Sequence, residues 1–296
     1  MATITFAIPF YRNRVFLERA IRSVLAQTSL AWSLLISDDA GPEENLQEWL
    51  RQFSHPEKIR FIRQPHNLGM AGNWNACIAL AEGELVTLLH ADDELEPTYA
   101  ALMLDAAQRR PAASVFFCQA TIIDAQGRPR FSFPDWIKRW LLPVRGREFT
   151  VVGDAGLRAV LRGNFIMCPT MCYRRRDLPA APFDARWKQV LDLDFIARRL
   201  FAGQQFVGLP QTAYRYRRHA ANQTQLQSDS LLRFEEEREV YRKIAAAAES
   251  HGWRGAARVA REMAIVKLNL LFCALQHLGR GQLADAWRKA AFLARM

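Results

Sequence analysis

Segments with strand-like and helix-like character alternate along the first 123 residues, and this alternation limits the chain to few folds. Apolar runs rich in β-forming residues occur at residues 3–9, 32–39 and 84–94, and the segments between them carry apolar residues at helical spacing. Regular alternation of strands and helices is typical of a mostly parallel sheet that is covered by helices. The sequence therefore predicts an α/β fold.

The regular alternation of strand-like and helix-like segments ends after residue 123. Residues 124–150 combine turn residues with an aromatic, basic segment, and from residue 229 the chain is rich in Ala, Glu and Arg with helical periodicity. The most apolar stretch, from Met263 to Leu278, contains Lys267 and is shorter than the roughly 18 apolar residues of a membrane-spanning helix. We therefore interpret it as a buried helix.

Charge and cysteine usage narrow the function classes. The formal net charge is +10, and Lys and Arg occur in clusters, which suits a phosphate-rich partner or an anionic membrane surface as well as simple solubility. No nucleic-acid-binding motif accompanies these clusters, so we expect no nucleic-acid partner. The five cysteines form no CxxC pair, and the first residues read as a strand rather than a secretory leader. These features predict a cytoplasmic protein with reduced thiols.

Acidic pairs follow two of the apolar strands. Asp38 and Asp39 end one strand, and Asp92 and Asp93 follow another. Aspartates at strand ends can simply cap the following helices. Ligands of parallel sheets, however, bind at the carboxyl ends of the strands, so two such pairs favour a functional site. The second pair, with His90 just upstream, offers oxygen ligands and one nitrogen, which suits Mg²⁺ or Mn²⁺ bound together with substrate phosphates.

Four segments carry a resemblance to a known family. They occur in the order IPFYRNRVFLERAIRSVLAQT, LLISDDAG, NLGMAGNWNACIALAEGELVTLLHADDELEP and VLDLDFIARRL. Over about residues 3–225 the chain resembles the family 2 inverting glycosyltransferases of the GT-A fold, of the type found in bacterial polysaccharide and lipopolysaccharide synthesis. The resemblance implies a nucleotide-sugar-binding half at residues 1–123, an acceptor-binding half of the same domain at 124–228, and a C-terminal helical extension at 229–296.

The resemblance also implies a donor site. Asp39, with Asp38 beside it, matches the aspartate that recognises the donor base, which favours a uracil or thymine nucleotide. His90, Ala91 and Asp92 occupy the D-x-D metal motif of the family, with a histidine in place of the first aspartate. Asp92 is then the implied metal ligand, and Asp93 is its neighbour. Further donor-site candidates are Pro9, Tyr11, Asn67, Gly69, Asn73, Arg217 and Arg218, and His219 is a further candidate for binding the metal or a phosphate.

The segment LDLDFIARR resembles the family's block that carries the catalytic base at a helix N-terminus. Arg198 fixes the register and places Asp192 at the base, while Leu191 stands where the family has a glutamate. Asp194 is the alternative base. Their order in the chain makes Asn164, Pro169 and Thr170 acceptor-site candidates.

Two segments have open interpretations. The aromatic, basic stretch from Trp136 to Arg147 is interpreted in one of two ways. It is either a loop or short helix packed over the acceptor cleft, or a contact with a lipid-linked acceptor at the inner face of the cytoplasmic membrane. The C-terminal helices are candidates for packing on the catalytic domain, for homo-oligomer formation or for peripheral membrane contact.

The implied activity is that of an inverting, hexosyltransferase-type glycosyltransferase assisted by Mn²⁺ or Mg²⁺. Its partners would be a nucleotide-sugar donor and a glycan or lipid-linked acceptor, whose hydroxyl proton Asp192 would remove. Two alternatives stay open. His90 and Leu191 are the departures that allow a catalytically silent protein that binds nucleotide sugars or glycans. A nucleotidyltransferase would also use acids at strand ends, but the first strand is not followed by a glycine-rich phosphate loop.

Overall fold

The computed structural model describes residues 2–132, 144, 146–218 and 231–296, and the chain forms two compact units that are interleaved in sequence. The first unit comprises Met1–Val151, Ile166–Arg186 and Gln204–His219, and the second comprises Val152–Phe165, Trp187–Gly203 and Ala220–Met296. The sequence predicted three consecutive parts, residues 1–123, 124–228 and 229–296, which were assigned by their expected functions. The two units are defined by packing, so the three functional parts remain a prediction.

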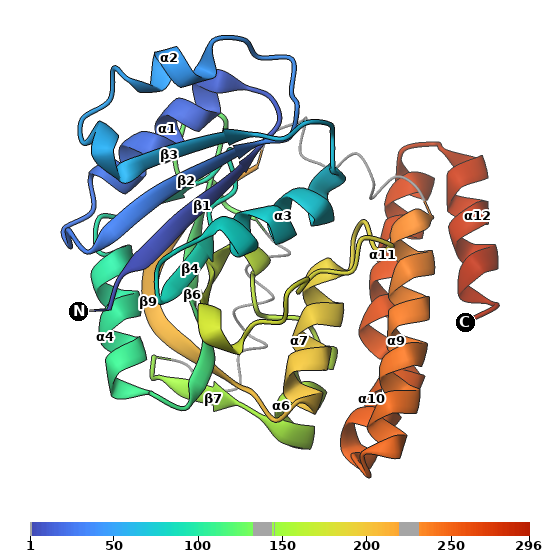
Figure 1. Ribbon diagram of the computed structural model, residues 1–296. Coiled ribbons are helices and arrows are strands. Elements are labelled where there is room, and N and C mark those ends of the chain that lie inside the picture. Colours follow the sequence, from blue (N-terminus) through green and yellow to red (C-terminus); the bar gives the residue numbers. More distant parts are fainter. Residues whose placement is uncertain (1, 133–143, 145, 219–230) are drawn as a thin grey trace. The chain divides into compact units, whose positions relative to one another are not determined.

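The first unit is built on a nine-stranded sheet in the order β3-β2-β1-β4-β8-β6-β9-β5, with β7 beside β9 (Figure 1). The strands are β1 (Ile4–Phe10), β2 (Trp32–Asp38), β3 (Ile59–Arg63), β4 (Leu85–Leu88), β5 (Glu94–Leu95), β6 (Ala113–Ile123), β7 (Phe149–Val151), β8 (Met171–Arg174) and β9 (Gln205–Arg217). The first four strands are parallel to their neighbours in the N-terminal part of the sheet, and β6 is parallel to β9. The strands β5, β7 and β8 pair antiparallel. The predicted α/β class is confirmed.

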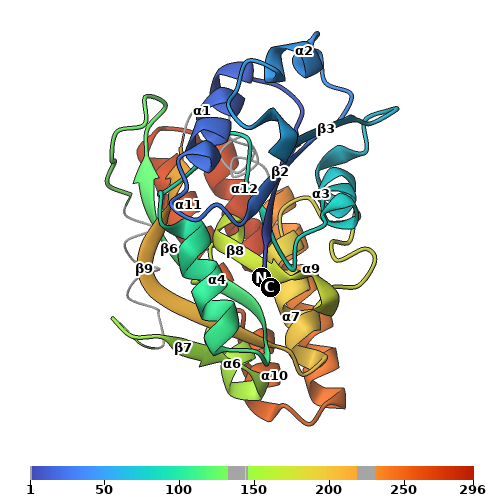
Figure 2. The same ribbon diagram turned by 60° about the vertical axis from the view of Figure 1, so that its left-hand side comes forward.

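Helices cover both faces of this sheet. They are α1 (Arg14–Leu25), α2 (Leu46–Leu50), α3 (Gly69–Leu80) and α4 (Tyr99–Arg109), with 3₁₀ turns at Pro56–Lys58, Cys168–Thr170 and Arg175–Asp177. The helices α1 and α4 share a core with the side chains of Phe6 and Ile36. Since side chains alternate along a strand, Ser37 points to the opposite face, where it bonds to Asn73 of α3. The helix α2 (Figure 2) covers only Leu46–Leu50, and Asn45 directly before it adopts a left-handed conformation.

The second unit is helical. It contains α6 (Gly153–Leu161), α7 (Leu191–Phe201), α9 (Leu232–Ser250), α10 (Arg254–Glu262), α11 (Ala264–Gly279) and α12 (Leu283–Leu293). The Tyr241 hydroxyl of α9 donates to the carbonyl of Leu161 at the end of α6, at 2.7 Å. The carboxylate of Glu236 accepts from the backbone N–H groups of Lys188 and Gln189, which precede α7. Side chains of α9 therefore fix the ends of both neighbouring helices.

The helix α11 corrects one expectation from the sequence. Val266, Leu270 and Ala274 are buried, as expected of a core helix, but Leu268 and Leu275 on the other side are more than half exposed. Apolar residues occur on opposite sides of this helix, yet only one of these sides packs against the rest of the second unit. No helix among the described residues is both long enough and apolar enough to cross a membrane.

Candidate functional site

The two acidic pairs lie at the same edge of the sheet. The strand β1 has parallel partners on both sides, β2 and β4. Asp38 and Asp39 stand where β2 ends, and the N–H of Asp39 donates to the carbonyl of Phe10 at the end of β1. Asp92 and Asp93 follow β4 within a turn, residues 90–93, that we call the acidic turn. The carboxyl ends of the three strands therefore meet where open α/β sheets bind ligands.

The two aspartates of the first acidic pair, Asp38 and Asp39, have different surroundings. Asp38 is buried, accepts from the N–H of Gly41 at 3.0 Å and forms an ion pair with Arg63 at 2.5 Å. Burial raises the pKa of the Asp38 carboxyl, against the lowering by Gly41 and Arg63. Asp39 uses only Oδ1, which accepts from the N–H of Leu68 at 2.7 Å. Among the described residues Oδ2 of Asp39 has no partner, so this carboxylate keeps an acceptor for a ligand.

Glycine is needed beside this pair. A Cβ on Gly41 would lie 1.8 Å from the carbonyl oxygen of Tyr11, so only glycine allows the segments after β1 and β2 to approach so closely. Pro9 at the end of β1 is half-buried, and the Tyr11 side chain is 46 % exposed at the same edge. Both lie where a nucleotide pocket was expected.

The turn before α3 is a structural support. Asn67 accepts from the N–H of Gly69, which has a φ of 71°, so the pair forms the turn that starts the helix. Asn73 is buried. Its Oδ1 accepts from the Ser37 hydroxyl, and its Nδ2 donates to the carbonyls of Ser37 and Phe10. The geometry therefore does not support a direct donor contact by Asn73. This residue instead ties α3 to the ends of β1 and β2.

The two carboxylates of the acidic turn have different surroundings. Asp93 is buried, and it accepts from the Tyr214 hydroxyl at 3.0 Å and from the N–H of Arg217 at 2.7 Å. Burial raises the pKa of the Asp93 carboxyl well above its usual range, and the neighbouring charge of Asp92 raises it further. Asp92 is only half-buried. The geometry favours Asp92 as the residue that meets a ligand and Asp93 as the residue that holds the turn.

His90 completes a candidate metal centre. One potential ligand atom from each of His90, Asp92 and Asp93 lies within 4.8 Å of the others. The His90 ring packs on Trp74 at a centroid distance of 5.1 Å, and its buried Nε2 has no hydrogen-bond partner among the described residues. Burial lowers the pKa of His90, which keeps the imidazole neutral and therefore able to coordinate. Nδ1 of the same ring lies 3.9 Å from Oδ2 of Asp93. A neutral imidazole beside two carboxylates fits a divalent cation, which Asp92 and His90 would hold.

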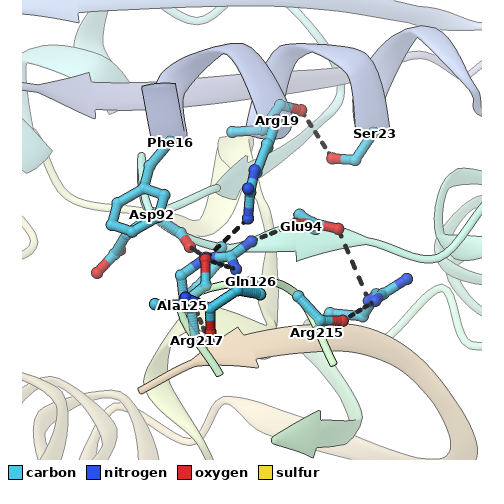
Figure 3. Close-up of polar contacts among 12 residues, drawn as sticks. Phe16, Arg19, Ser23, Asp92, Glu94, Ala125, Gln126, Arg215 and Arg217 are labelled. Atoms are coloured by element: carbon cyan, nitrogen blue, oxygen red, sulfur yellow. Dashed lines mark hydrogen bonds and ion pairs between the residues drawn. The ribbon is translucent and has the colours of Figure 1, made fainter. Parts of the chain in front are cut away.

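Arg217 explains how the acidic turn is held in place (Figure 3). Its side chain is fully buried, and Nε donates to the carbonyl of Asp92 at 2.7 Å. The other guanidinium nitrogens contact the carbonyls of Asp124 and Ala125 and the carboxylate of Glu94. The guanidinium also lies over the ring of Phe16, 4.9 Å from its centroid. The sequence predicted that Arg217 binds the donor diphosphate. In this structure its donors are directed into the protein, so the geometry does not support that contact.

Further arginines fix the loop at residues 124–128. Arg19 of α1 donates to the carbonyl of Ala125 at 2.8 Å, and Arg215 donates to the carbonyl of Gly127 at 2.6 Å (Figure 3). The basic cluster at residues 215–218 was visible in the sequence, but the direction of its side chains was not. Glu94, directly after the acidic pair, had no distinguishing signal.

The predicted catalytic residues belong to the second unit. Asp194 is buried, and its carboxylate forms 2.7 Å ion pairs with Lys243 and Arg198. Burial by itself would raise the pKa of Asp194, but these cations outweigh it and lower the pKa. Asp192 is half-buried and accepts from the Asn164 amide at 3.0 Å. The alternative base, Asp194, is therefore occupied by structural contacts.

The remaining candidates have different outcomes. Asn164, an acceptor candidate, lies directly beside Asp192. Pro169 and Thr170 belong to the first unit and are buried. The Thr170 hydroxyl donates to the carbonyl of Met167, so neither side chain is presented to an acceptor. Arg218 is half-buried above the ring of Tyr216. His219 and most of the Trp136 to Arg147 stretch lie outside the described residues.

The fold and the acidic turn define a GT-A glycosyltransferase architecture. The sheet order, the paired strand-end acids and the helical C-terminal part all agree with this class. Residues 5–178 match the family described as Glycosyl transferase family 2. The chain belongs to this family.

Relatives and solved structures agree with the assignment. The chain is 26 % identical over 219 residues to an uncharacterized protein of Mycobacterium bovis, covering 71 % of the chain and 57 % of that relative, so it spans little more than half of the relative's length. It is 32 % identical over 102 residues to the putative colanic acid biosynthesis glycosyl transferase WcaA of Escherichia coli, covering 34 % of the chain and 36 % of WcaA.

Solved structures show the same fold at low identity. The structure of TarS residues 1–349 from S. aureus with UDP-GlcNAc has a TM-score of 0.62 at 16 % identity, over 94 % of this chain and 73 % of that one. The structure of GalNAc-T7 with UDP, GalNAc and Mn²⁺ has a TM-score of 0.56 at 12 % identity, over 74 % of this chain and 44 % of that one. The GT-A type fold expected from the sequence is confirmed.

Proposed function

We infer that the chain transfers a sugar from a nucleoside diphosphate sugar to a hydroxyl group of a glycan or lipid-linked acceptor. The observation that carries this function is the meeting of Asp39 and the acidic turn at the carboxyl ends of β2 and β4, on either side of β1. This edge offers an acceptor for the base of a nucleotide and a cation site for its diphosphate. Membership of the family and the UDP-sugar complex of the TarS structure support it.

Donor recognition rests on Asp39. Its Oδ1 is held by the N–H of Leu68, which fixes the plane of the carboxylate, and Oδ2 is left to accept from a base N–H. A uracil or thymine ring carries such an N–H, so a UDP-sugar or dTDP-sugar fits this carboxylate. Tyr11 lies exposed at the same edge and offers an aromatic surface for the base.

A divalent cation at Asp92 and His90 would neutralise charge on the leaving diphosphate. The protein prepares this site by holding the acidic turn from behind. Arg217 binds the backbone of Asp92, while Asp93 is held by Tyr214 and the N–H of Arg217, so the backbone that carries the Asp92 side chain is held in place before a ligand arrives. Mn²⁺ in the GalNAc-T7 structure supports an ion of this kind.

Asp192 is proposed as the general base that removes the acceptor proton, which makes the reaction a single displacement with inversion. The Asn164 amide donates to one of its oxygens and so orients the carboxylate. Asp194 is the weaker candidate, because its carboxylate forms ion pairs with Lys243 and Arg198. Asp192 therefore carries the acid–base role, and Asn164 positions it. Cytoplasmic nucleotide sugars would supply the donor.

A panel of UDP- and dTDP-sugars tests this function. With Mn²⁺ present, the 296-residue chain should hydrolyse at least one donor slowly without acceptor, and mass spectrometry should detect transfer to an added glycan or lipid-linked acceptor. Asp92→Asn should remove hydrolysis and leave the fold intact by circular dichroism. Tight UDP binding without hydrolysis or transfer of any donor would favour a silent nucleotide-sugar-binding protein instead.

A further inference from the structure

The C-terminal helices carry an apolar face that is exposed in the structure. Seven of the fourteen large hydrophobic side chains that are exposed in the described part of the chain fall between residues 268 and 287. We call these seven residues the apolar face: they are Leu268, Leu271, Phe272, Leu275, Leu278, Leu283 and Trp287. Scattered exposed apolar residues are normal, but half of them within one helical hairpin indicates an interaction surface.

The spacing on α11 shows that the face is a continuous stripe. Leu268, Leu271 and Leu275 recur three and four residues apart, and Phe272 and Leu278 extend the same series. At about 100° per residue, this stripe is centred roughly 140° from the buried residues Val266, Leu270, Ala274 and His277. A surface helix of a globular protein would carry polar residues there. The stripe therefore needs an apolar environment on its outer side.

The neighbouring helix α12 continues this character. Leu283 and Trp287, one helical turn apart, are 65 % and 74 % exposed. A tryptophan with this exposure is characteristic of the boundary between water and lipid, where one part of the ring is apolar and the indole N–H stays hydrated.

Charge decides between the possible occupants of the face. Residues 264–296 contain five basic side chains and a single acidic one. Arg280, Arg288 and Arg295 are exposed. Asp285 is paired with Arg288, so the hairpin offers no surplus of acids to meet these cations. A second copy would bring two basic hairpins together, whereas a surface rich in anionic headgroups complements them.

We propose that the hairpin of α11 and α12 lies in the headgroup region of an anionic lipid bilayer, with the apolar face inserted and the basic residues near the phosphates. A helix of 16 residues cannot span the bilayer, but it can lie in its plane. This mode of binding would bring the enzyme to the surface where a lipid-linked acceptor is found. The face does not depend on the proposed sugar transfer.

Vesicle sedimentation of the full 296-residue chain tests the proposal. The protein should sediment with vesicles of phosphatidylcholine containing phosphatidylglycerol, should bind pure phosphatidylcholine much less, and should dissociate as salt is raised. The variant Leu271→Ser/Leu275→Ser/Trp287→Ser should lose at least tenfold in the partition coefficient, because binding scales with the apolar area inserted. Arg280→Gln should lose about fivefold, which corresponds to about 1 kcal/mol per basic residue.

Leu30→Ser provides a matched control, because Leu30 is 70 % exposed but belongs to the first unit. This variant should bind vesicles as the wild type does. The proposal is overturned if the wild type ignores anionic vesicles, or if the triple variant binds them equally well. A wild-type dimer in sedimentation velocity that becomes monomeric in the triple variant, without vesicle binding, would identify a second copy as the occupant. The assay needs no turnover, so its failure is distinct from a failure of donor hydrolysis.

Discussion

Replacing Arg217 with methionine should destabilise the first unit strongly. The change keeps most of the side-chain volume but removes every donor, so the carboxylate of Glu94 loses its closest cation and the carbonyls of Asp92, Asp124 and Ala125 lose theirs. Breaking one side of a buried ion pair costs about 3–5 kcal/mol. Glu94 keeps a second cation in Arg215, at 3.7 Å, so the lower end of this range applies. We expect a loss of this size in the free energy of unfolding.

The exposed neighbour Arg215 is the control for this experiment. It also faces Glu94, at 3.7 Å, but it is partly exposed. Arg215→Met should therefore cost only about 0–1 kcal/mol from the ion pair, the range of solvent-exposed pairs, plus a similar amount for its bond to Gly127. Urea unfolding measures the free energy of unfolding of both variants. A double variant with Glu94→Gln should show a coupling energy of about 0.5–3 kcal/mol with Arg217→Met, since the two residues share one contact.

The same variant has a functional readout. Because Arg217 binds the backbone of Asp92, loss of the guanidinium should also weaken UDP binding in the presence of Mn²⁺, measured by calorimetry under conditions where the variant is folded. Arg217→Lys should recover part of the stability, because an ammonium group can still contact Glu94. If Arg217→Met loses less than about 1 kcal/mol and binds UDP like the wild type, the guanidinium does not anchor the acidic turn and the reasoning is wrong.

Four further predictions follow from the site. Asp192→Asn should lower kcat by about 10²–10⁴-fold with unchanged UDP affinity, as expected for loss of a general base, and a larger effect of Asp194→Asn in kinetics at equal stability would reverse the assignment. Asp39→Ala should weaken UDP binding by about 1–3 kcal/mol in calorimetry, and unchanged affinity would remove this residue from the donor site. Chelation with EDTA should abolish transfer and Mn²⁺ should restore it in the wild type but not in Asp92→Asn, whereas full activity in a metal-free preparation would contradict the cation site. The folded protein lowers the pKa of Asp194, so this carboxylate stabilises the fold at pH values above its unfolded pKa of about 3.9. The stabilisation is lost as the pH falls through the lower pKa of the folded state. Lys243→Met should therefore move the midpoint of acid unfolding to higher pH, and an unchanged midpoint would show that the ion pair does not have this role.

Local patterns in the sequence predicted the class of fold and the edge of the sheet where the site lies. Strand-like apolar runs that alternate with helical segments can pack in only a few folds. Acidic residues that directly follow such strands lie at the carboxyl ends of the strands. Asp39 and Asp92 could therefore be predicted as site residues without coordinates, and the structure brings both to the same edge of the sheet. The order of the four family segments indicated the family, which the match of residues 5–178 confirms.

The sequence does not show which residues have contacts that depend on distant partners. Arg217 meets Asp92 across 125 positions of the chain, and Asp194 meets Lys243 across 49. Thr170 and Asn73 have polar side chains that suit ligand binding, yet both are buried and bonded to their own protein. No local pattern distinguishes a polar side chain that faces a ligand from one that faces the core.

What the sequence by itself determined is thus the set of chemical groups and the strands that carry them. Only the tertiary structure showed how the carboxylates differ: Asp38, Asp93 and Asp194 are buried and bonded within the protein. Asp39 is bonded through Oδ1, and Asp92 and Asp192 are half-buried. The tertiary structure also decided that one side of α11 stays exposed. The physical reason is that burial and hydrogen bonding are set by strands and helices far apart in the chain, whereas periodicity records only what a segment can do by itself.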